Sequence, residues 1–188
     1  MAFSIDQLVA DCVAAAEREG GHAGVAVEEV LSRTLSDASA IEAAIGHPRD
    51  LPLLSPWYQS DTLTVLHVVW PPTVDLVPHD HLMWAAIALY GGREDNRVFR
   101  SLPDGGLELR RTTTLRGGDT ILLGDDAVHA VANPSREWTG AVHVYGGDFF
   151  RDGKRMWPDP GVGGRPFDFE VLRSTLADAA DRARADGL

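Results

Sequence analysis

The stretch WPPTVDLVPHDH, residues 70–81, ends in two histidines that stand two positions apart, His79 and His81. On a β-strand, side chains two positions apart point to the same face, so both imidazoles can reach one metal ion. A third histidine, His129, ends the later stretch RGGDTILLGDDAVH, residues 116–129. A β-barrel can bring this histidine back beside the first two. We therefore expect one metal site built from His79, His81 and His129.

The chain around these histidines has the texture of a β-barrel. Short runs rich in β-branched and aromatic residues follow one another from about residue 62 to residue 150. The runs are LTVLHVVW, MWAAIALY, RVFRSL, LELRRTTTL, DTILLG, AVHAVAN and TGAVHVYGG, and the segments PPT, GGRED, PDGG, RGGD and NPSRE separate them. Gly, Pro and Asp at such spacing are typical of turns. We predict about seven short strands in a sandwich or jelly-roll barrel.

A helix is expected at the N-terminal end of the chain. Apolar residues recur at helical spacing within residues 4–19, and Ser4 with Gln7 has the form of a capping box. The single cysteine, Cys12, lies on the apolar stripe of this helix. Because a free cysteine in such a place behaves as a small hydrophobe, we expect a buried structural thiol without chemistry.

Three further helices are predicted from apolar spacing and from helix-breaking residues. They cover residues 25–35, a segment from residue 36 or 37 to just before Gly46, and residues 167–185. A chain of 188 residues falls in the size range of one domain. We expect a helical part over residues 1–46, the barrel over 62–150 and a closing helix over 167–185.

The charge of the chain argues against nucleic acid and membrane as partners. The formal net charge is −11, from 28 acidic and 17 basic side chains, and such a field repels phosphate backbones and anionic lipid surfaces. The sequence has no basic segment followed by an unbroken apolar stretch at its start, and no run of about 18 apolar residues. With one cysteine besides, these features predict a cytoplasmic protein that binds small molecules as a monomer or homodimer.

The two histidine stretches resemble the two motifs of the cupin superfamily, in which an HxH pair and a later histidine after a Gly-Asp turn hold one metal ion. Many cupins have a glutamate as fourth ligand a few residues after the pair, but residues 84–87 here read WAAI. The resemblance implies a cupin jelly roll, or double-stranded β-helix, with three neutral imidazole ligands. Such a set leaves the full charge and adjacent open positions on the metal, which favours redox iron(II). Zinc with three histidines and a water is the alternative.

A second polar pair follows in the run AVHVYGGDF, where His143 and Tyr145 point the same way on a strand. The order PHDH, VHAVANPS and VHVYGGDF resembles the thiol dioxygenases: the cysteine dioxygenase family and, more closely, its bacterial relatives that act on 3-mercaptopropionate. The resemblance covers roughly residues 70–157. It implies that the hydroxyl of Tyr145 lies beside the iron and hydrogen-bonds the substrate or oxygen, and that His143 orients it.

The chain departs from that family at several positions. The serine of the family's Ser-His-Tyr chain falls at Ala141, and the cysteine that crosslinks to the tyrosine in the animal enzymes falls near Ala86. The carboxylate-binding arginine of the animal enzymes has no match in SPWYQSD, residues 55–61. In the bacterial relatives such an arginine follows the YGGDF stretch, just before a tryptophan. Here YGGDFFRDGKRMW offers Arg155, with Arg151 as second choice, to bind a substrate carboxylate.

The activity implied by the resemblance is the oxidation of a small thiol to its sulfinic acid by O₂ at Fe²⁺. Three alternatives stay open: a three-histidine iron dioxygenase that cleaves carbon–carbon bonds in a β-diketone, a non-catalytic cupin that binds a metal or small ligand, and a zinc hydrolase or lyase. The other histidines are left out of the site. His67 is expected in the core or at a strand edge, and His22 and His47 in solvated loops.

Overall fold

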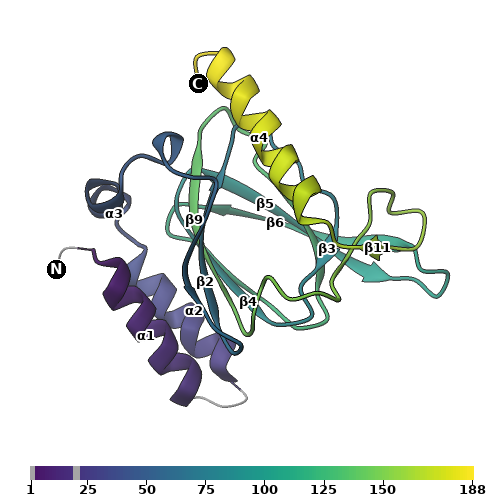
Figure 1. Ribbon diagram of the computed structural model, residues 1–188, viewed down its shortest axis with the longest axis horizontal. Helices are drawn as coiled ribbons and strands as arrows, with labels where there is room; N and C mark the ends of the chain where they lie inside the picture. The colour runs from purple at the N-terminus through teal and green to yellow at the C-terminus, as the bar shows by residue number, and fades with distance from the viewer. Residues whose placement is uncertain (1–2, 19–21) are drawn as a thin grey trace.

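Two antiparallel β-sheets face each other in the computed structural model, which describes residues 3–18 and 22–188 (Figure 1). The strands are β1 (Leu54–Gln59), β2 (Thr64–Trp70), β3 (His79–Asp80), β4 (Ala85–Gly91), β5 (Arg93–Ser101), β6 (Leu107–Arg116), β7 (Thr120–Leu123), β8 (Val128–Ala132), β9 (Thr139–Tyr145), β10 (Arg155–Met156) and β11 (Arg165–Pro166). One sheet has the order β1-β2-β9-β4-β7 and the other β11-β10-β3-β8-β5-β6. This arrangement is the double-stranded β-helix, or jelly roll, that the sequence predicts.

The helices lie outside the barrel, before and after it in the chain. They are α1 (Ile5–Arg18), α2 (Ala23–Thr34), α3 (Ala38–Ile45), the short 3₁₀ helix η2 (Pro48–Asp50) and α4 (Phe169–Ala185). The four α-helices agree with the expected helices to within about two residues, whereas η2 was not expected; residue 19 lies outside the described residues. Ser4 Oγ accepts a hydrogen bond from the Gln7 backbone N–H at 3.3 Å, as in the expected cap. None of the helices in the described segments is long and apolar enough to cross a bilayer.

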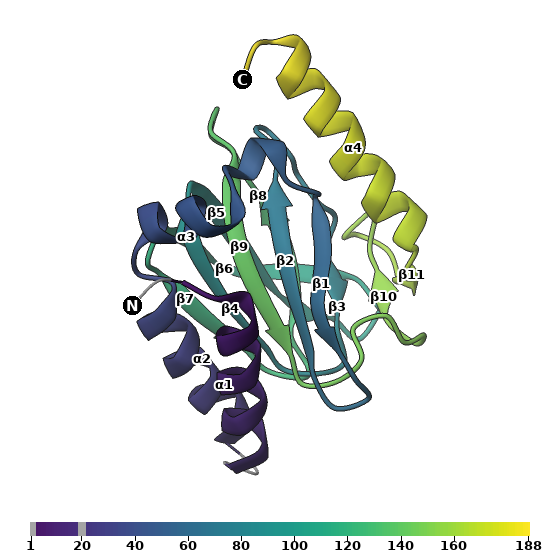
Figure 2. The ribbon, with the colours of Figure 1, turned by 60° about the vertical axis from the view of Figure 1, so that its left-hand side comes forward.

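The three central strands of the five-stranded sheet, β2, β9 and β4, are buried on both faces, which explains their nearly continuous apolar sequences. On β9, Ala141 and Tyr145 face the barrel interior, whereas Val142 and Val144 pack against α1 and α2. Figure 2 shows these helices lying across the outside of the sheet. His143 shares the inward face with Ala141 and Tyr145 because side chains alternate with period two.

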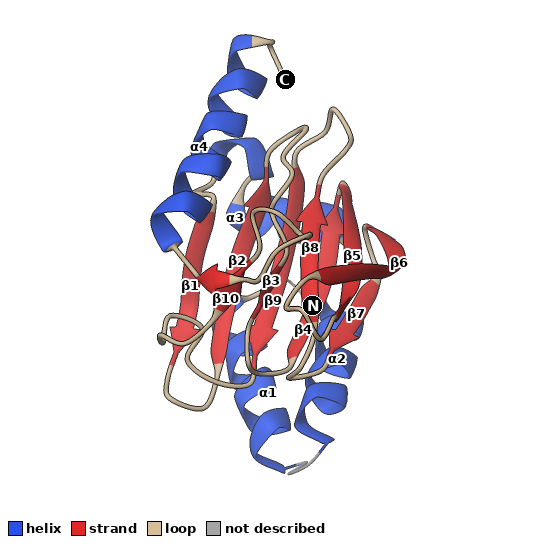
Figure 3. Cartoon of the chain, turned by 90° about the vertical axis from the view of Figure 1, so that its right-hand side faces the viewer, coloured by secondary structure: helices blue, strands red, loops and turns tan. Residues whose placement is uncertain are grey.

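The sheets extend beyond the expected range of residues 62–150. Strand β1 precedes that range, and β10 and β11 follow it at the edge of the second sheet (Figure 3). Pro56 lies in β1 without breaking it, because β1 is an edge strand and its pairing with β2 shifts between Pro56 and Tyr58.

The segment GGRED is not a turn as a whole. Strand β4 ends at Gly91 and β5 begins at Arg93, so Gly92 alone, with a φ of 76°, makes the change of direction. Glu94 and Asp95 therefore belong to a strand, and the side chain of Glu94 is fully buried. This correction matters for the site described below.

Two residues that the sequence assigns to the core are confirmed there. Cys12 is buried between α1 and its neighbours, and burial raises the pKa of its thiol to about 12. His67 stacks on Trp57 with ring centroids 4.9 Å apart, and its Nε2 lies 2.9 Å from the hydroxyl of Tyr90. Burial lowers the pKa of His67 to about 4. His22 and His47 are exposed.

We predict that Gly140→Ala destabilises the protein by about 1–3 kcal/mol or more. An added Cβ at Gly140 would stand 2.1 Å from Cζ of Tyr90, which would have to move away from His67. Chemical denaturation measures the effect, with Gly163→Ala as the control because nothing lies within 4 Å of a Cβ there. Equal free energies of unfolding for the two variants would show that the close contact between Gly140 and Tyr90 does not require glycine.

Candidate metal centre

The structure brings together the three histidines that the sequence singles out. Strand β3 pairs with β8 so that His79 lies opposite His129, and His81 follows directly after β3. One ligand nitrogen from each ring lies within 4.8 Å of the others, and all three side chains are buried. The pairing of two strands far apart in sequence thus creates the site.

Hydrogen bonds at Nδ1 orient two of the three rings. His79 Nδ1 donates to the carbonyl oxygen of Val77 at 3.0 Å, and His129 Nδ1 donates to Oδ1 of Asn96 at 2.8 Å. A proton on Nδ1 leaves the lone pair of Nε2 free for a metal ion. Nδ1 of His81 has no partner among the described residues.

All three imidazoles are kept neutral. Burial lowers the pKa of His79 to about 4 and lowers the pKa values of His81 and His129 well below their usual range. Neutral rings can bind a metal ion without first losing a proton. The site is therefore ready to take a cation near neutral pH.

The spacing of the nitrogens fits a bound metal ion. Nε2 of His81 lies 2.9 Å from Nε2 of His129. Two nitrogens bound to one ion at right angles, with bonds of about 2.1 Å, stand about 3 Å apart, whereas tetrahedral ligands stand about 3.4 Å apart. The observed separation is close to that of two ligands of one ion, and the third nitrogen lies within 4.8 Å of both. The three histidines could therefore hold a metal ion.

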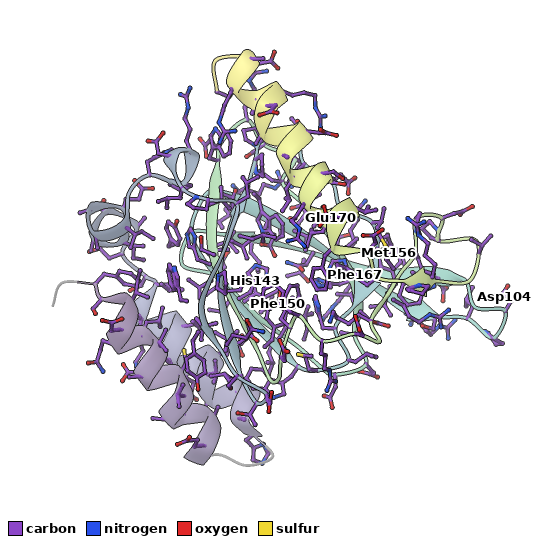
Figure 4. The ribbon with its side chains drawn as sticks, in the orientation of Figure 1. Asp104, His143, Phe150, Met156, Phe167 and Glu170 are labelled. Carbon is purple, nitrogen blue, oxygen red and sulfur yellow. The ribbon has the colours of Figure 1, made fainter. Side chains whose placement is uncertain are left out.

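Tyr145 and His143 lie next to this group. The ring of Tyr145 packs against His81 with centroids 4.9 Å apart, and its hydroxyl lies 3.2 Å from Nδ1 of His143. Burial raises the pKa of the Tyr145 phenol above its usual value, and the nearby carboxylate of Glu94 adds to the effect. The phenol therefore keeps its proton and can act as a hydrogen-bond donor. Figure 4 shows His143 inside the barrel.

A buried carboxylate connects the metal ligands to this pair. Oε1 of Glu94 accepts from Nδ2 of Asn96 at 2.6 Å, and Oε2 accepts from Nε1 of Trp70 at 2.5 Å. The same Oε2 lies 3.6 Å from Nε2 of His143. Asn96 in turn accepts from His129. Glu94 is thus the common member of two branches, one ending at a metal ligand and one at Tyr145.

The charge of Glu94 decides how its neighbours are protonated. A buried carboxylate needs donors around it, so a proton on Nε2 of His143 is favoured. Nδ1 of His143 can then accept a hydrogen bond from the Tyr145 hydroxyl. The NH₂ group of Asn96 must face Glu94, so the oxygen of Asn96 faces His129 and selects its tautomer.

Glu94 is also the polar group next to His143 in a chain that lacks the serine of the Ser-His-Tyr chain. Ala141, at the serine position, is buried in the barrel interior and offers no hydroxyl. Glu94 approaches His143 instead, from β5. The sequence carries a signal for this residue: Glu94 and Asn96 stand two positions apart in REDNRVF. The assignment of GGRED to a turn concealed it.

The side chains of the two arginines expected to bind a carboxylate do not line the cavity at the histidines, although the backbone N–H of Arg155 donates to Asp80 at 2.8 Å. Arg155 is exposed; its guanidinium donates to the carbonyl of Gly164 at 2.6 Å and lies over the ring of Trp157. Arg151 is exposed and donates to the carbonyl of Leu82 at 3.1 Å. Neither lines the cavity at the metal centre. Carboxylate binding by Arg155 stays a prediction.

A small apolar cavity of about 20 Å³ adjoins the histidines. It is lined by Leu54, Leu66, Val68, Trp70, Leu76, His79, His81, His129, Val131, His143, Tyr145, Phe149, Phe167 and Leu172. This volume is enough for about one water molecule. A larger ligand requires aromatic side chains at the edge of the cavity to move.

The fold is a cupin-type double-stranded β-helix, and its three buried histidines could hold a metal ion. No protein-family model and no curated protein sequence matches the chain.

Solved structures of the same fold resemble this one. A protein of Bacillus halodurans has 14% identity over 71% of this chain and 90% of its own, with a TM-score of 0.49. An uncharacterized protein with a double-stranded β-helix domain from Klebsiella pneumoniae has 17% identity over 57% and 80%, with a TM-score of 0.45. The DMSP lyase DddQ from Ruegeria pomeroyi has 18% identity over 54% and 46%, with a TM-score of 0.43. Similarities of this extent assign no activity.

We predict that Asn96→Ala weakens metal binding about 10- to 100-fold, because His129 loses the partner that fixes its tautomer. Titration of the metal-free protein with iron(II) under anaerobic conditions, in competition with a chelator, measures the affinity. Gln59→Ala, which removes an exposed amide far from the histidines in sequence, is the control. A variant that folds and binds iron as tightly as the wild type would contradict this role of Asn96.

Proposed function

We propose that the chain is a non-haem iron(II) thiol dioxygenase that converts a small thiol to its sulfinic acid with O₂. The observation that carries the proposal is the His143–Tyr145 pair beside three buried imidazoles with no carboxylate among them. A purely structural metal site has no need of a protonated phenol at its edge. The motif resemblance to thiol dioxygenases points to the same reaction.

The reaction adds both atoms of O₂ to one sulfur: a thiolate and O₂ give a sulfinate, with sulfur oxidised by four electrons and O₂ reduced by four. Iron(II), when bound, would supply a position for the thiolate and the redox partner for O₂. The chain's own residues supply the surroundings. The apolar lining of the cavity excludes water, and the three neutral imidazoles leave the positive charge of the ion uncompensated.

The one proton of the Tyr145 hydroxyl is shared with Nδ1 of His143 at rest, and it turns to the reacting atoms when they are bound, so that Tyr145 donates a hydrogen bond to them. Its hydroxyl holds a proton because the phenol is buried, and it lies on the side of His81. His143 positions this hydroxyl through Nδ1, and Glu94 holds the opposite edge of the His143 ring. A carbon–carbon-cleaving dioxygenase with the same three histidines would have no use for this pair, which is why we favour a thiol substrate.

The test is oxygen consumption by the protein reconstituted anaerobically with iron(II), with 3-mercaptopropionate, cysteine and cysteamine as substrates. We expect stoichiometric iron, thiol-dependent O₂ uptake and a sulfinate product identified by mass spectrometry. Tyr145→Phe should lower kcat about a hundredfold with a smaller change in KM. Tyr58→Phe is the matched control, because Tyr58, on strand β1, packs against the apolar cluster that includes the N-terminal helices.

The outcomes that would contradict the proposal also distinguish the alternative functions from one another. Iron without O₂ uptake for any of the thiols would support the diketone-cleaving or the non-catalytic reading. Zinc as the only metal retained would exclude a dioxygenase. Equal activity of Tyr145→Phe and wild type would remove the role given to the phenol.

A further inference from the structure

The cavity at the metal centre has no charged side chain among the described residues that line it. Nine of its fourteen lining residues are apolar, and the other five are the three histidines, His143 and Tyr145. The indole N–H of Trp70, on the same wall, already donates to Glu94. A carboxylate or ammonium group of a substrate would therefore find no side chain of opposite charge here. Because the cavity has room for only about one water molecule, most of any substrate must lie outside it.

A second, larger pocket of about 480 Å³ lies between β1 and α4. Figure 2 shows α4 lying alongside the edge strand β1. Six of the seven residues that line this pocket are apolar, and the seventh is Arg173, whose exposed guanidinium is paired with the carboxylate of Glu170 at 3.1 Å. Its volume falls within the range of about 300–1,000 Å³ that is common for small-molecule sites. The lining of this apolar pocket fits an uncharged hydrocarbon group.

The apolar pocket and the metal cavity share a wall. Leu54, the first residue of β1, lines both spaces. Phe149 lines the metal cavity, where its ring stacks on Tyr145 with centroids 4.4 Å apart. The same ring meets Phe150 at 5.2 Å and Phe169 at 5.7 Å, and these two line the apolar pocket. A ligand that extends from the histidines past Leu54 would therefore stay in apolar surroundings.

Another outer pocket, of about 500 Å³, meets the metal cavity at Phe167 and has a different chemistry. Its lining includes Arg151, Lys154 and Arg155, and each of these cations donates a hydrogen bond to a backbone carbonyl. A hydrocarbon chain in this pocket would lie against charged groups and gain little from leaving water. The two neighbouring pockets therefore favour two different classes of substrate, and only the apolar one continues the apolar lining of the metal cavity.

We propose that the apolar pocket binds the hydrocarbon body of the substrate, which is an uncharged thiol with a chain of several carbons and with its sulfur at the histidines. The nature of the sulfur end rests on the function proposed above; the apolar site does not. The side chain of Leu54 must turn aside to connect the two spaces. Each CH₂ group that leaves water should tighten binding about fourfold.

The apolar site is tested without metal or turnover by NMR titration of the isotope-labelled chain with 1-hexanol and 1-propanol. We expect shifts at the amides of Phe150, Phe169 and Leu176, and binding of 1-hexanol at least about tenfold tighter than that of 1-propanol. Leu53→Trp, which fills the pocket from a position outside the lining of the metal cavity, should weaken binding of 1-hexanol at least about tenfold. Leu109→Trp is the matched control, since Leu109 is exposed on β6. Equal affinities for the two alcohols, or shifts at another place, would overturn the proposal.

A second measurement connects the apolar site to the sulfur end of the substrate. O₂ uptake by the iron(II) protein is compared for 1-hexanethiol, 1-propanethiol and 3-mercaptopropionate. We expect kcat/KM to be at least about tenfold higher for 1-hexanethiol than for 1-propanethiol, and Leu53→Trp should abolish this difference. A preference for 3-mercaptopropionate over both uncharged thiols would overturn the proposal and leave the dioxygenase function in place. Binding of 1-hexanol in the apolar pocket without O₂ uptake for any thiol would mean that the oxygenase function fails and the apolar site stands.

Discussion

The carboxylate of Glu94 has no contact with solvent, and each of its oxygens is held by a group that leads to the metal centre. Through Asn96 it selects the tautomer of His129, and it favours a proton on Nε2 of His143, so that Nδ1 can accept from Tyr145. A buried negative charge of this kind costs free energy unless donors surround it. The same charge partly balances the cation that three neutral imidazoles would leave uncompensated. Hydrogen bonds through Asn96 thus join the ligand His129 to Glu94, and the His143–Tyr145 pair lies beside the same carboxylate, with Nε2 of His143 at 3.6 Å.

The barrel makes this arrangement possible because its central strands β2, β4 and β9 are covered on both faces. Helices α1 and α2 bury the outward side chains of β9, so the inward side chains are free to be polar where the site requires it. The ring of His143 meets Trp70 edge-on at 5.7 Å, and Tyr145 stacks on Phe149 at 4.4 Å. These aromatic contacts restrict the rings to single orientations. Lys154 lies 5.7 Å from the ring centroid of Phe149 and lines a separate outer pocket together with Arg151 and Arg155, whereas the small cavity at the histidines has a mostly apolar lining.

The residues that could be predicted from sequence are those whose positions follow from strand periodicity. His79 with His81 and His143 with Tyr145 each stand two positions apart, and the later motif supplies His129. Glu94 was hidden because an Arg-Glu-Asp run after two glycines has the composition of a turn, although only Gly92 turns. Lys154 and Arg155 are neighbours in the chain, and their opposite burial follows from the pairing of β10 with β3 and β11, which no local pattern indicates.

The most direct test of this account is the position of iron in the protein. Crystals of the chain reconstituted with iron(II) under anaerobic conditions should give one anomalous peak at the iron edge. We predict a peak about 2.1 Å from one nitrogen each of His79, His81 and His129, with no carboxylate bound and with Asn96 still bonded to His129. Iron bound at another place, a carboxylate among its ligands, or no ordered iron would contradict the account.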